Sequence, residues 1–325
     1  LREATISVVD SLDNLGQSPD LIHGQHHLET MTALTHFPDV PAIYVCHGLR
    51  PWEEAPPRLG RIYRYAAVDQ AVRDRLVFQH GVPAEKVRVI HNFADMHRFL
   101  PRPSLPPQPR TAALFSNYAH EKSAYFRAVQ EACARLNLKL DVIGAGMNNS
   151  SPHPEKILPN YDVVFAQGRS AIEALAVGCA VVIGSSRRVG PLVRTGNLES
   201  LIGLNFGVRT QIYPVEAEVL IRELMNYDSC DAAEVSRRIR QQSSLESAVD
   251  ALTELYEEAL AEHRSGGHAP TESREVAAYL RWLNPRMRQA GVLLAENNLL
   301  KDEVQRLGKT STALHRIQNS ATWRL

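Results

Sequence analysis

The chain has 325 residues, enough for two α/β domains and a tail, and its 36 basic residues balance 36 acidic ones. A formal net charge of zero excludes a global field that would attract nucleic acid or an anionic membrane, so any anion site must be local. No uninterrupted apolar stretch approaches the ~20 residues of a membrane span, which predicts a soluble protein.

The four cysteines lie far apart with no Cys-x-x-Cys pair, and this spacing argues against a disulfide scaffold and a zinc site. The start of the chain lacks the pattern of a secretory signal peptide, so a reducing cytoplasm is the expected compartment. Because the first residue is Leu1 rather than Met, a fragment with a missing start is the alternative to a complete chain.

The first hundred residues alternate between predicted helices and strands, beginning with helical spacing over Leu1–Leu15. The predicted strands are Asp20–Gly24, Pro41–Gly48, Ile62–Asp69 and Val87–Asn92, and the predicted helices between them are Leu28–His36 and Gln70–His80. Such alternation predicts a parallel sheet with helices on both faces. A proline-rich linker follows over residues 101–110, because the prolines of Pro101–Pro109 exclude a helix or a central strand.

A second α/β domain is expected over residues 111–265. Its predicted strands are Thr111–Asn117, Leu138–Gly144, Tyr161–Gln167 and Ala180–Gly184. The predicted helices between these strands are Glu121–Leu136 and Ser170–Val177. Three more helical runs follow at Glu216–Asn226, Cys230–Gln241 and Ser244–His263. Gly144-Ala-Gly146 is expected to form a tight turn. Gly168 and Gly178 punctuate a βαβ unit, and a polar loop, Ser185–Gly190, follows its last strand.

The tail, residues 266–325, is less regular until leucine recurs every seven residues at Leu293, Leu300, Leu307 and Leu314. Asn297 and Val304 occupy the intervening positions. Leucine at one seam position with asparagine or valine at the other is typical of a short parallel coiled coil, which favours a homodimer through this helix. A single docked helix is the alternative.

Glu173 lies among apolar helix neighbours, where a carboxylate needs a partner unless it is at the helix surface. The run from Glu173 to Val182 reads Glu-Ala-Leu-Ala-Val-Gly-Cys-Ala-Val-Val. It resembles the donor-binding signature of the retaining glycosyltransferases of family 4, with Ala180 in place of the family proline. The resemblance extends over most of the chain. It implies a GT-B fold of two Rossmann-like domains, with further βα units expected before Leu1, and sugar transfer from a nucleotide sugar with retention and without a metal.

The resemblance also assigns a diphosphate-binding role. Lys122 matches the family lysine that contacts the donor diphosphate, and Asn117 stands where the family has an arginine. Losing that cation removes a charge-assisted hydrogen bond to phosphate. Arg188 and Gly190 lie in a run that resembles the family glycine loop against the donor phosphates. For Lys122 and Arg188, an ordinary solvated basic residue is the alternative.

Glu173 matches the second of two family glutamates and is expected to contact the donor ribose. The first glutamate of the pair is replaced by Phe165, a departure beside the transferred sugar. The turn of Gly168, Arg169 and Ser170 leads into the helix, where backbone N–H groups can receive phosphate or sugar oxygens. Arg169 is the candidate to replace the missing arginine, with a surface role as the alternative.

In the first domain, His26 follows a predicted strand and stands near the place of a family histidine that faces the transferred sugar. His47, after the next strand, is a second candidate, and a structural role is the alternative for both. No set of histidines and carboxylates with ligand spacing surrounds His26, so we expect no metal and no cofactor apart from the donor substrate.

These features predict a hexosyltransferase of bacterial surface-polysaccharide assembly, with His26, Lys122 and Glu173 as the catalytic residues. It would use a nucleoside-diphosphate sugar and a saccharide or lipid-linked acceptor, in the cytoplasm or at the inner face of the membrane. The alternative is a catalytically silent relative that binds a saccharide or a partner transferase, which Phe165, Asn117 and the short first domain favour. A nucleotide-sugar epimerase is a third hypothesis.

Overall fold

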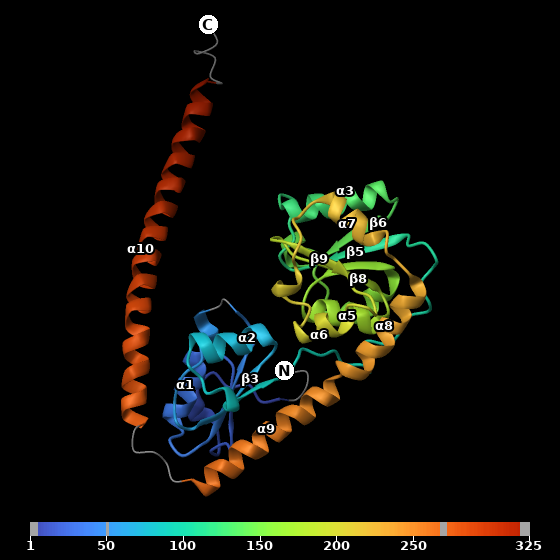
Figure 1. The fold of residues 1–325 in the computed structure, drawn as a ribbon. Helices are drawn as coiled ribbons and strands as arrows, with labels where there is room; N and C mark the ends of the chain where they lie inside the picture. The colour runs from blue at the N-terminus through green and yellow to red at the C-terminus, as the bar shows by residue number, and fades with distance from the viewer. Residues whose placement is uncertain (1–5, 50–51, 267–271, 319–325) are drawn as a thin grey trace. The chain divides into compact units, whose positions relative to one another are not determined.

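The computed structural model describes residues 6–49, 52–266 and 272–318, which form two compact units (Figure 1). The larger unit contains both β-sheets. The smaller unit consists mainly of the tail helix α10 (Glu272–Gln318). Of the helix expected over Leu1–Leu15, residues 1–5 lie outside the described residues. The rest was predicted wrongly, since residues 6–15 contain only a 3-10 turn at Leu12–Asn14, whose exposed side chains offer no apolar face to bury.

The first sheet has four parallel strands in the order β1-β2-β3-β4, which confirms the predicted parallel pairing. The strands are β1 (Ile22–Gly24), β2 (Ala42–Cys46), β3 (Ile62–Ala67) and β4 (Val87–Val89). The helices are α1 (His27–His36) and α2 (Gln70–Asp74), which continues as a π-helical turn over Arg75–Gln79. Every residue of β2 is buried, as expected for a strand covered on both faces.

The second sheet has five strands in the order β6-β5-β7-β8-β9, of which only the edge strand β9 is antiparallel. The strands are β5 (Thr111–Phe115), β6 (Lys139–Ile143), β7 (Val163–Ala166), β8 (Ala180–Gly184) and β9 (Val189–Leu192). The helices are α3 (Ala124–Arg135), α4 (Pro154–Ile157), α5 (Arg169–Val177), α6 (Leu198–Gly203), α7 (Ala217–Leu224) and α8 (Ser229–Gln242).

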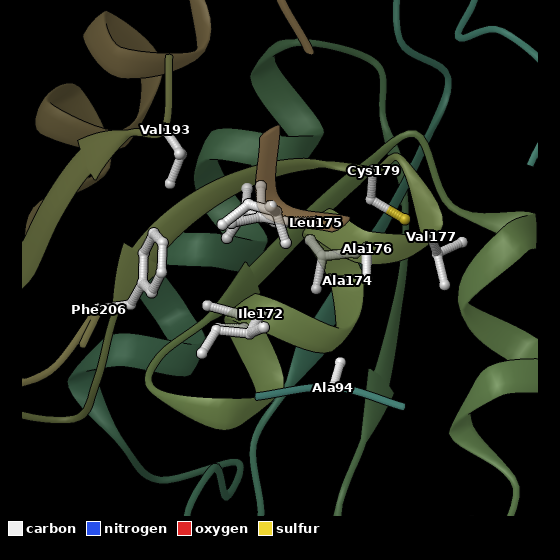
Figure 2. Packing of buried hydrophobic residues seen from close by; sticks show 14 of the residues in the cluster. Ala94, Ile172, Ala174, Leu175, Ala176, Val177, Cys179, Val193 and Phe206 are labelled. Carbon is white, nitrogen blue, oxygen red and sulfur yellow. The ribbon is translucent and has the colours of Figure 1, made fainter. Parts of the chain in front are cut away.

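The core of this domain lies on both faces of the second sheet because alternate residues of a strand point to opposite faces. Val164 and Ala166 of β7 pack in the cluster that contains most of α5, whose apolar residues are seen in Figure 2. Val163 and Phe165 pack in the other cluster, with residues of α3 and α7. Helix α5 is therefore held by its apolar side chains against one face of the sheet.

Two predicted boundaries in the second domain were wrong, at the start of α3 and in the loop before β9. Helix α3 begins at Ala124 rather than Glu121, because the Ser123 side chain accepts a hydrogen bond from the backbone N–H of Phe126 and caps the helix there. The loop predicted over Ser185–Gly190 is shorter. Val189 already pairs with Gly184 of β8, so β9 begins there and includes Gly190.

Helix α9 (Leu245–Ser265) packs against the first sheet, although the sequence analysis placed it with the second domain. Leu255 and Ala259 are fully buried against β2 and β3. Arg64 of β3 donates to Glu258 at 2.8 Å and to Glu262 at 2.6 Å. The chain thus returns to its first sheet after completing the second.

The linker has neither helix nor strand from Pro101 to Pro109, as predicted, but it packs against the second domain. Leu105 is buried in the cluster of α3 and α7. Arg102 forms an ion pair of 3.0 Å with the buried Asp162. The linker therefore follows a defined course along this domain.

The tail is helical much earlier than predicted. α10 begins at Glu272, well before Leu293, and continues for 47 residues with Pro285 inside it. Over Glu272–Gln318 no residue is buried. The backbone N–H of Gly60 donates a hydrogen bond of 2.7 Å to Glu275 near the start of this helix.

Candidate functional site

A pocket of about 240 Å³ opens at the carboxyl ends of β5 and β6, beside the start of α5. Ligands of open α/β sheets bind at this edge, because the loops that leave the strands converge there. The lining residues are Phe115, Ser116, Asn117, Ile143, Gly144, Ser150, Ser151, Arg169, Ser170 and Glu173. The tertiary structure thus brings Asn117, Arg169, Ser170 and Glu173 of the predicted donor site together.

The loops that follow β5 and β6 are packed closely at this pocket. The φ angle of Gly144 is 154°, and a Cβ atom there would lie 2.0 Å from the backbone oxygen of Ser116, so only glycine fits. The side-chain oxygen of Asn117 accepts a hydrogen bond of 3.1 Å from the backbone N–H of Ala145. Asn117 therefore joins the two loops in addition to lining the pocket. The expected turn at Gly144 is confirmed, with a 3-10 turn over Ala145–Met147.

The first turn of α5 also faces this pocket. Gly168 precedes the helix with φ of 56°, a left-handed conformation that favours glycine, and its N–H donates to the backbone oxygen of Phe206 at 2.9 Å. The N–H groups of Arg169 and Ser170 come next and have no carbonyl four residues earlier within the helix. Their position gives the pocket a helix N-terminus suited to an anion.

Glu173 lies one turn further along α5, with its side chain 12% exposed. Its Oε1 accepts a hydrogen bond of 3.1 Å from Nε of Arg169, so the partner that the sequence required comes from the same helix. Burial raises the pKa of Glu173, and the Arg169 guanidinium opposes that change. The Arg169 guanidinium also lies 5.8 Å from the ring centre of Phe93. The pocket wall thus contains both a guanidinium group, from Arg169, and a carboxylate, from Glu173.

Lys122 lines a neighbouring hollow of about 300 Å³, together with His120, Glu121, Gly146, Met147 and Asn148. The two hollows are formed by successive parts of the same two loops, since Asn117 and Gly144 border the first and Lys122 and Gly146 border the second. Lys122 therefore does not line the pocket of Glu173. It lies in the loop before α3, not within the helix that the sequence predicted.

Three other predicted positions lie away from both hollows. Arg188 is exposed in the turn between β8 and β9, where its backbone oxygen accepts from Ser185. Gly190 is buried within β9, and a Cβ atom there would lie 2.7 Å from the backbone oxygen of Thr210, so close packing accounts for this glycine. Phe165 is fully buried in the cluster with α3 and α7.

Three histidines occupy the carboxyl edge of the first sheet. His26 is the residue before α1, His23 lies in β1, and His47 follows β2. Desolvation lowers the pKa of His23, and nearby His47 lowers it further. Desolvation also lowers the pKa of His47. The charge of Glu54 raises this pKa in part, and nearby His26 lowers it further. The interactions show that the histidines are neighbours, and the lowered pKa values favour neutral imidazoles at His23 and His47 near pH 7.

The backbone around His47 is held by Glu54, and His23 is held by α9. The buried Glu54 carboxylate accepts hydrogen bonds from the N–H groups of His47 and Gly48. The ring Nδ1 of His23 lies 2.7 Å from the hydroxyl of Tyr256. The sequence analysis missed Tyr256, because a residue 233 positions away carries no local signal of this contact.

Sequence reasoning also missed Ser116, Ser150 and Ser151 in the pocket wall. Ser116 could have been found, since it directly follows a strand at the ligand-binding edge. Nothing in the polar segment of Ser150 and Ser151 distinguishes it from a surface loop. Among the described residues, no group of three or more His, Cys, Asp or Glu side chains is placed to hold a metal. Within the same ranges, no helix has the length and apolar character to cross a bilayer.

Residues 6–98, which include the first sheet, match the sequence model of Glycosyltransferase Family 4. A glycosyltransferase from Rickettsia africae ESF-5 has 15% identity and a TM-score of 0.52, covering 74% of this chain and 77% of that one. The pneumococcal O-GlcNAc transferase GtfA, solved with UDP and GlcNAc, has 13% identity and a TM-score of 0.49, covering 74% of this chain and 57% of its own. MurG of Acinetobacter baumannii has 12% identity and a TM-score of 0.42, with 73% of each chain covered. No curated protein matches the chain.

The likeness to the Rickettsia protein confirms the fold. This chain has the expected α/β architecture of the GT-B type, with two Rossmann-like sheets followed by a long helix. The match over residues 6–98 does not include the motif at Glu173, so the two likenesses concern different parts of the chain.

Proposed function

We propose that this protein is a glycosyltransferase that binds a nucleoside-diphosphate sugar at the carboxyl edge of its second sheet. It transfers the sugar, with retention of anomeric configuration, to a saccharide or lipid-linked acceptor. The observation that carries the proposal is the single pocket where Asn117, the start of α5 and Glu173 meet. The family match and the fold support the same class of reaction.

The size of the hollows is consistent with two parts of one ligand. Pockets for drug-sized molecules usually measure ~300–1,000 Å³, so a hollow of about 240 Å³ would hold only part of a nucleotide sugar. The hollow beside Lys122 adds about 300 Å³. We assign the ribose to the pocket of Glu173, whose carboxylate can accept hydrogen bonds from its hydroxyl groups. The diphosphate would lie over the loops toward Lys122.

In the reaction, the bond between the anomeric carbon and the β-phosphate oxygen breaks, and its electron pair stays with the diphosphate. The acceptor hydroxyl forms the new bond to the anomeric carbon, and its proton passes to the departing diphosphate oxygen. Lys122 and the N–H groups at the start of α5 would stabilise the charge that develops on the diphosphate. His26, in the first domain, would hydrogen-bond the sugar or the acceptor. The chemistry proposed here requires no metal. A lipid-linked acceptor would bring the protein to a membrane surface.

Calorimetric titration of the full chain with UDP, GDP and ADP tests this proposal. We expect one of the three to bind, and Glu173→Ala and Lys122→Ala to weaken its binding ~10-fold to 100-fold, because hydrogen bonds to charged groups contribute about 1.5–3 kcal/mol. Lys139→Ala is the matched control, since Lys139 is exposed at the amino end of β6. The proposal fails if no nucleotide binds or if Glu173→Ala binds as tightly as the wild type.

A silent relative that binds without transferring is the second candidate, and Phe165 favours it. The side chain at this position is fully buried in the core, so it supplies no acid to a bound sugar. Binding of donor without sugar transfer to any acceptor would favour this candidate. Epimerisation of the donor in the absence of acceptor would instead indicate the third hypothesis.

A further inference from the structure

The apolar stripe of α10 has no partner in the described chain. Its leucines at 293, 300, 307 and 314 are 54–66% exposed, and Val304 is 69% exposed. An isolated helix gains little stability from propensity alone, and most helical stability in proteins comes from packing an apolar face. A 47-residue helix without a buried side chain therefore requires a partner that covers this stripe.

The spacing of the stripe is that of a coiled-coil seam. If the four leucines take position d of the heptad, position a is occupied by Asn297, Val304 and Ser311. We use the word seam for these seven residues. They extend over 22 residues from Leu293 to Leu314, about 32 Å of helix at ~1.5 Å per residue. The spacing of seven repeats without interruption over this length.

The seam and its flanks are complementary to a second copy of themselves. A polar asparagine at a single a position pairs best with the same asparagine of a partner helix, and such residues specify register. In a parallel dimer, each g position faces the e position five residues further along the partner. Here Glu296 is at g and Lys301 is at e, so each chain offers its partner an opposite charge.

The charges also select the orientation. An antiparallel pair would place the g row of one helix beside the g row of the other. Glu296 and Glu303 both belong to that row, so acidic side chains would face each other. A parallel arrangement in register avoids this repulsion and pairs Asn297 with its own copy.

We propose that α10 is the dimerisation element of this protein and forms a parallel, in-register, two-stranded coiled coil with a second copy of the same chain. Asn297 sets the register, and Glu296 pairs with Lys301 of the partner subunit. The proposal does not rest on the glycosyltransferase assignment. It concerns residues 293–314, none of which belongs to the candidate site.

Light scattering or sedimentation equilibrium of the full chain tests the stoichiometry. We expect a mass near twice 36.2 kDa, falling to 36.2 kDa in Leu300→Lys/Leu307→Lys. Glu296→Lys should weaken the dimer at least 10-fold, and Glu296→Lys/Lys301→Glu should restore it, because the double change re-forms the opposite charges. Lys309→Glu is the control, since residue 309 takes position f, away from the seam.

Cysteine crosslinking tests the orientation in a Cys230→Ser background, which removes the exposed native thiol. Ser311→Cys should crosslink on mild oxidation, because two a positions face each other in a parallel pair. In an antiparallel pair centred on this seam, the two thiols would be separated by ~15 residues, about 22 Å. Lys309→Cys should not crosslink.

The following results would overturn the proposal. A monomer at tens of micromolar, a dimer that survives Leu300→Lys/Leu307→Lys, or a dimer in which Ser311→Cys fails to crosslink would each exclude the parallel seam. A monomer whose binding to vesicles of phosphatidylcholine and phosphatidylglycerol is abolished by the leucine changes would assign the stripe to a lipid surface instead.

Discussion

At the scale of single residues, Glu173 has the strongest claim to function. A carboxylate whose side chain is only 12% exposed carries a desolvation cost, and a single exposed arginine offsets it only in part. Residues that reduce stability tend to be retained at sites where a ligand uses them. The remaining polar side chains of the pocket, Asn117 and four serines, are neutral, so Glu173 and Arg169 provide the charge of this wall.

Glu173→Gln should separate stability from binding. Burial raises the folded-state pKa of Glu173, so the protonated form is favoured by folding. Its contribution to stability is therefore complete below the ordinary glutamate pKa of about 4.3 and declines as pH rises through the folded-state value. The glutamine side chain does not titrate, so the variant should gain stability relative to the wild type as pH rises from about 4 to about 7.5.

Urea unfolding at both pH values measures that difference, and calorimetry on the same variant should show at least 10-fold weaker nucleotide binding. A stability difference that stays constant between about pH 4 and about pH 7.5 would contradict the proposed burial of the charged form.

At the scale of elements, α9 is held on the first sheet by a small core and a row of ion pairs. Arg64 and Arg88 extend from β3 and β4 to acidic residues at Glu254, Glu258 and Glu262. The hydrogen bond from Arg64 is the main cause that lowers the pKa of Glu258. Leu255 and Ala259 supply the apolar contact between the ion pairs and the sheet. These contacts hold α9 on a sheet that is distant from it in the sequence.

Arg64→Met should destabilise the protein at neutral pH while keeping the packing of the side-chain stem. We expect a loss of about 1 kcal/mol, because the partner carboxylates are more than one-third exposed and solvent screens the pairs. Since the pKa of Glu258 is lowered by folding, this contribution is present above the ordinary pKa and is lost as pH falls through the folded-state value.

Urea unfolding from pH 7 to pH 3 measures that dependence, because the loss occurs below the ordinary glutamate pKa of about 4.3. Arg237→Met, which removes an exposed pair on α8, should cost less stability than Arg64→Met, because solvent screens exposed charges. Equal losses in the two variants would show that the pairs of α9 have no special role.

At the scale of the whole molecule, the candidate nucleotide site and the tail helix belong to different compact units. All the residues that line the two hollows lie in the larger unit, and the seam lies in the smaller one. Nucleotide binding and dimerisation should therefore be separable properties.

The monomeric variant Leu300→Lys/Leu307→Lys should bind the preferred nucleotide within twofold of the wild type, as measured by calorimetry. A loss of more than 10-fold would show that the partner subunit contributes to the site. The Glu173→Ala variant should give the reverse result, with weak nucleotide binding and an unchanged dimer mass.

The local features of this chain could be predicted from sequence because each depends on neighbouring residues. Alternating short apolar runs and helical segments predicted both parallel sheets, and Gly168 and Gly178 marked the ends of α5 correctly. Proline content predicted the absence of helix and strand over Pro101–Pro109. The heptad spacing of the tail leucines predicted a coiled coil, and its pairing with a second copy of the chain is a proposal.

Long-range relations were decided by the tertiary structure alone. A strand buried on both faces is apolar throughout, so the sequence could not show that Phe165 points into the core away from Glu173. Antiparallel pairing with β8 makes Gly190 part of a strand rather than of the expected loop. Ion pairs between residues nearly two hundred positions apart hold α9 on the first sheet. Sequence periodicity depends only on residues that are near one another along the chain, whereas a binding site depends on which loops lie together in the folded protein.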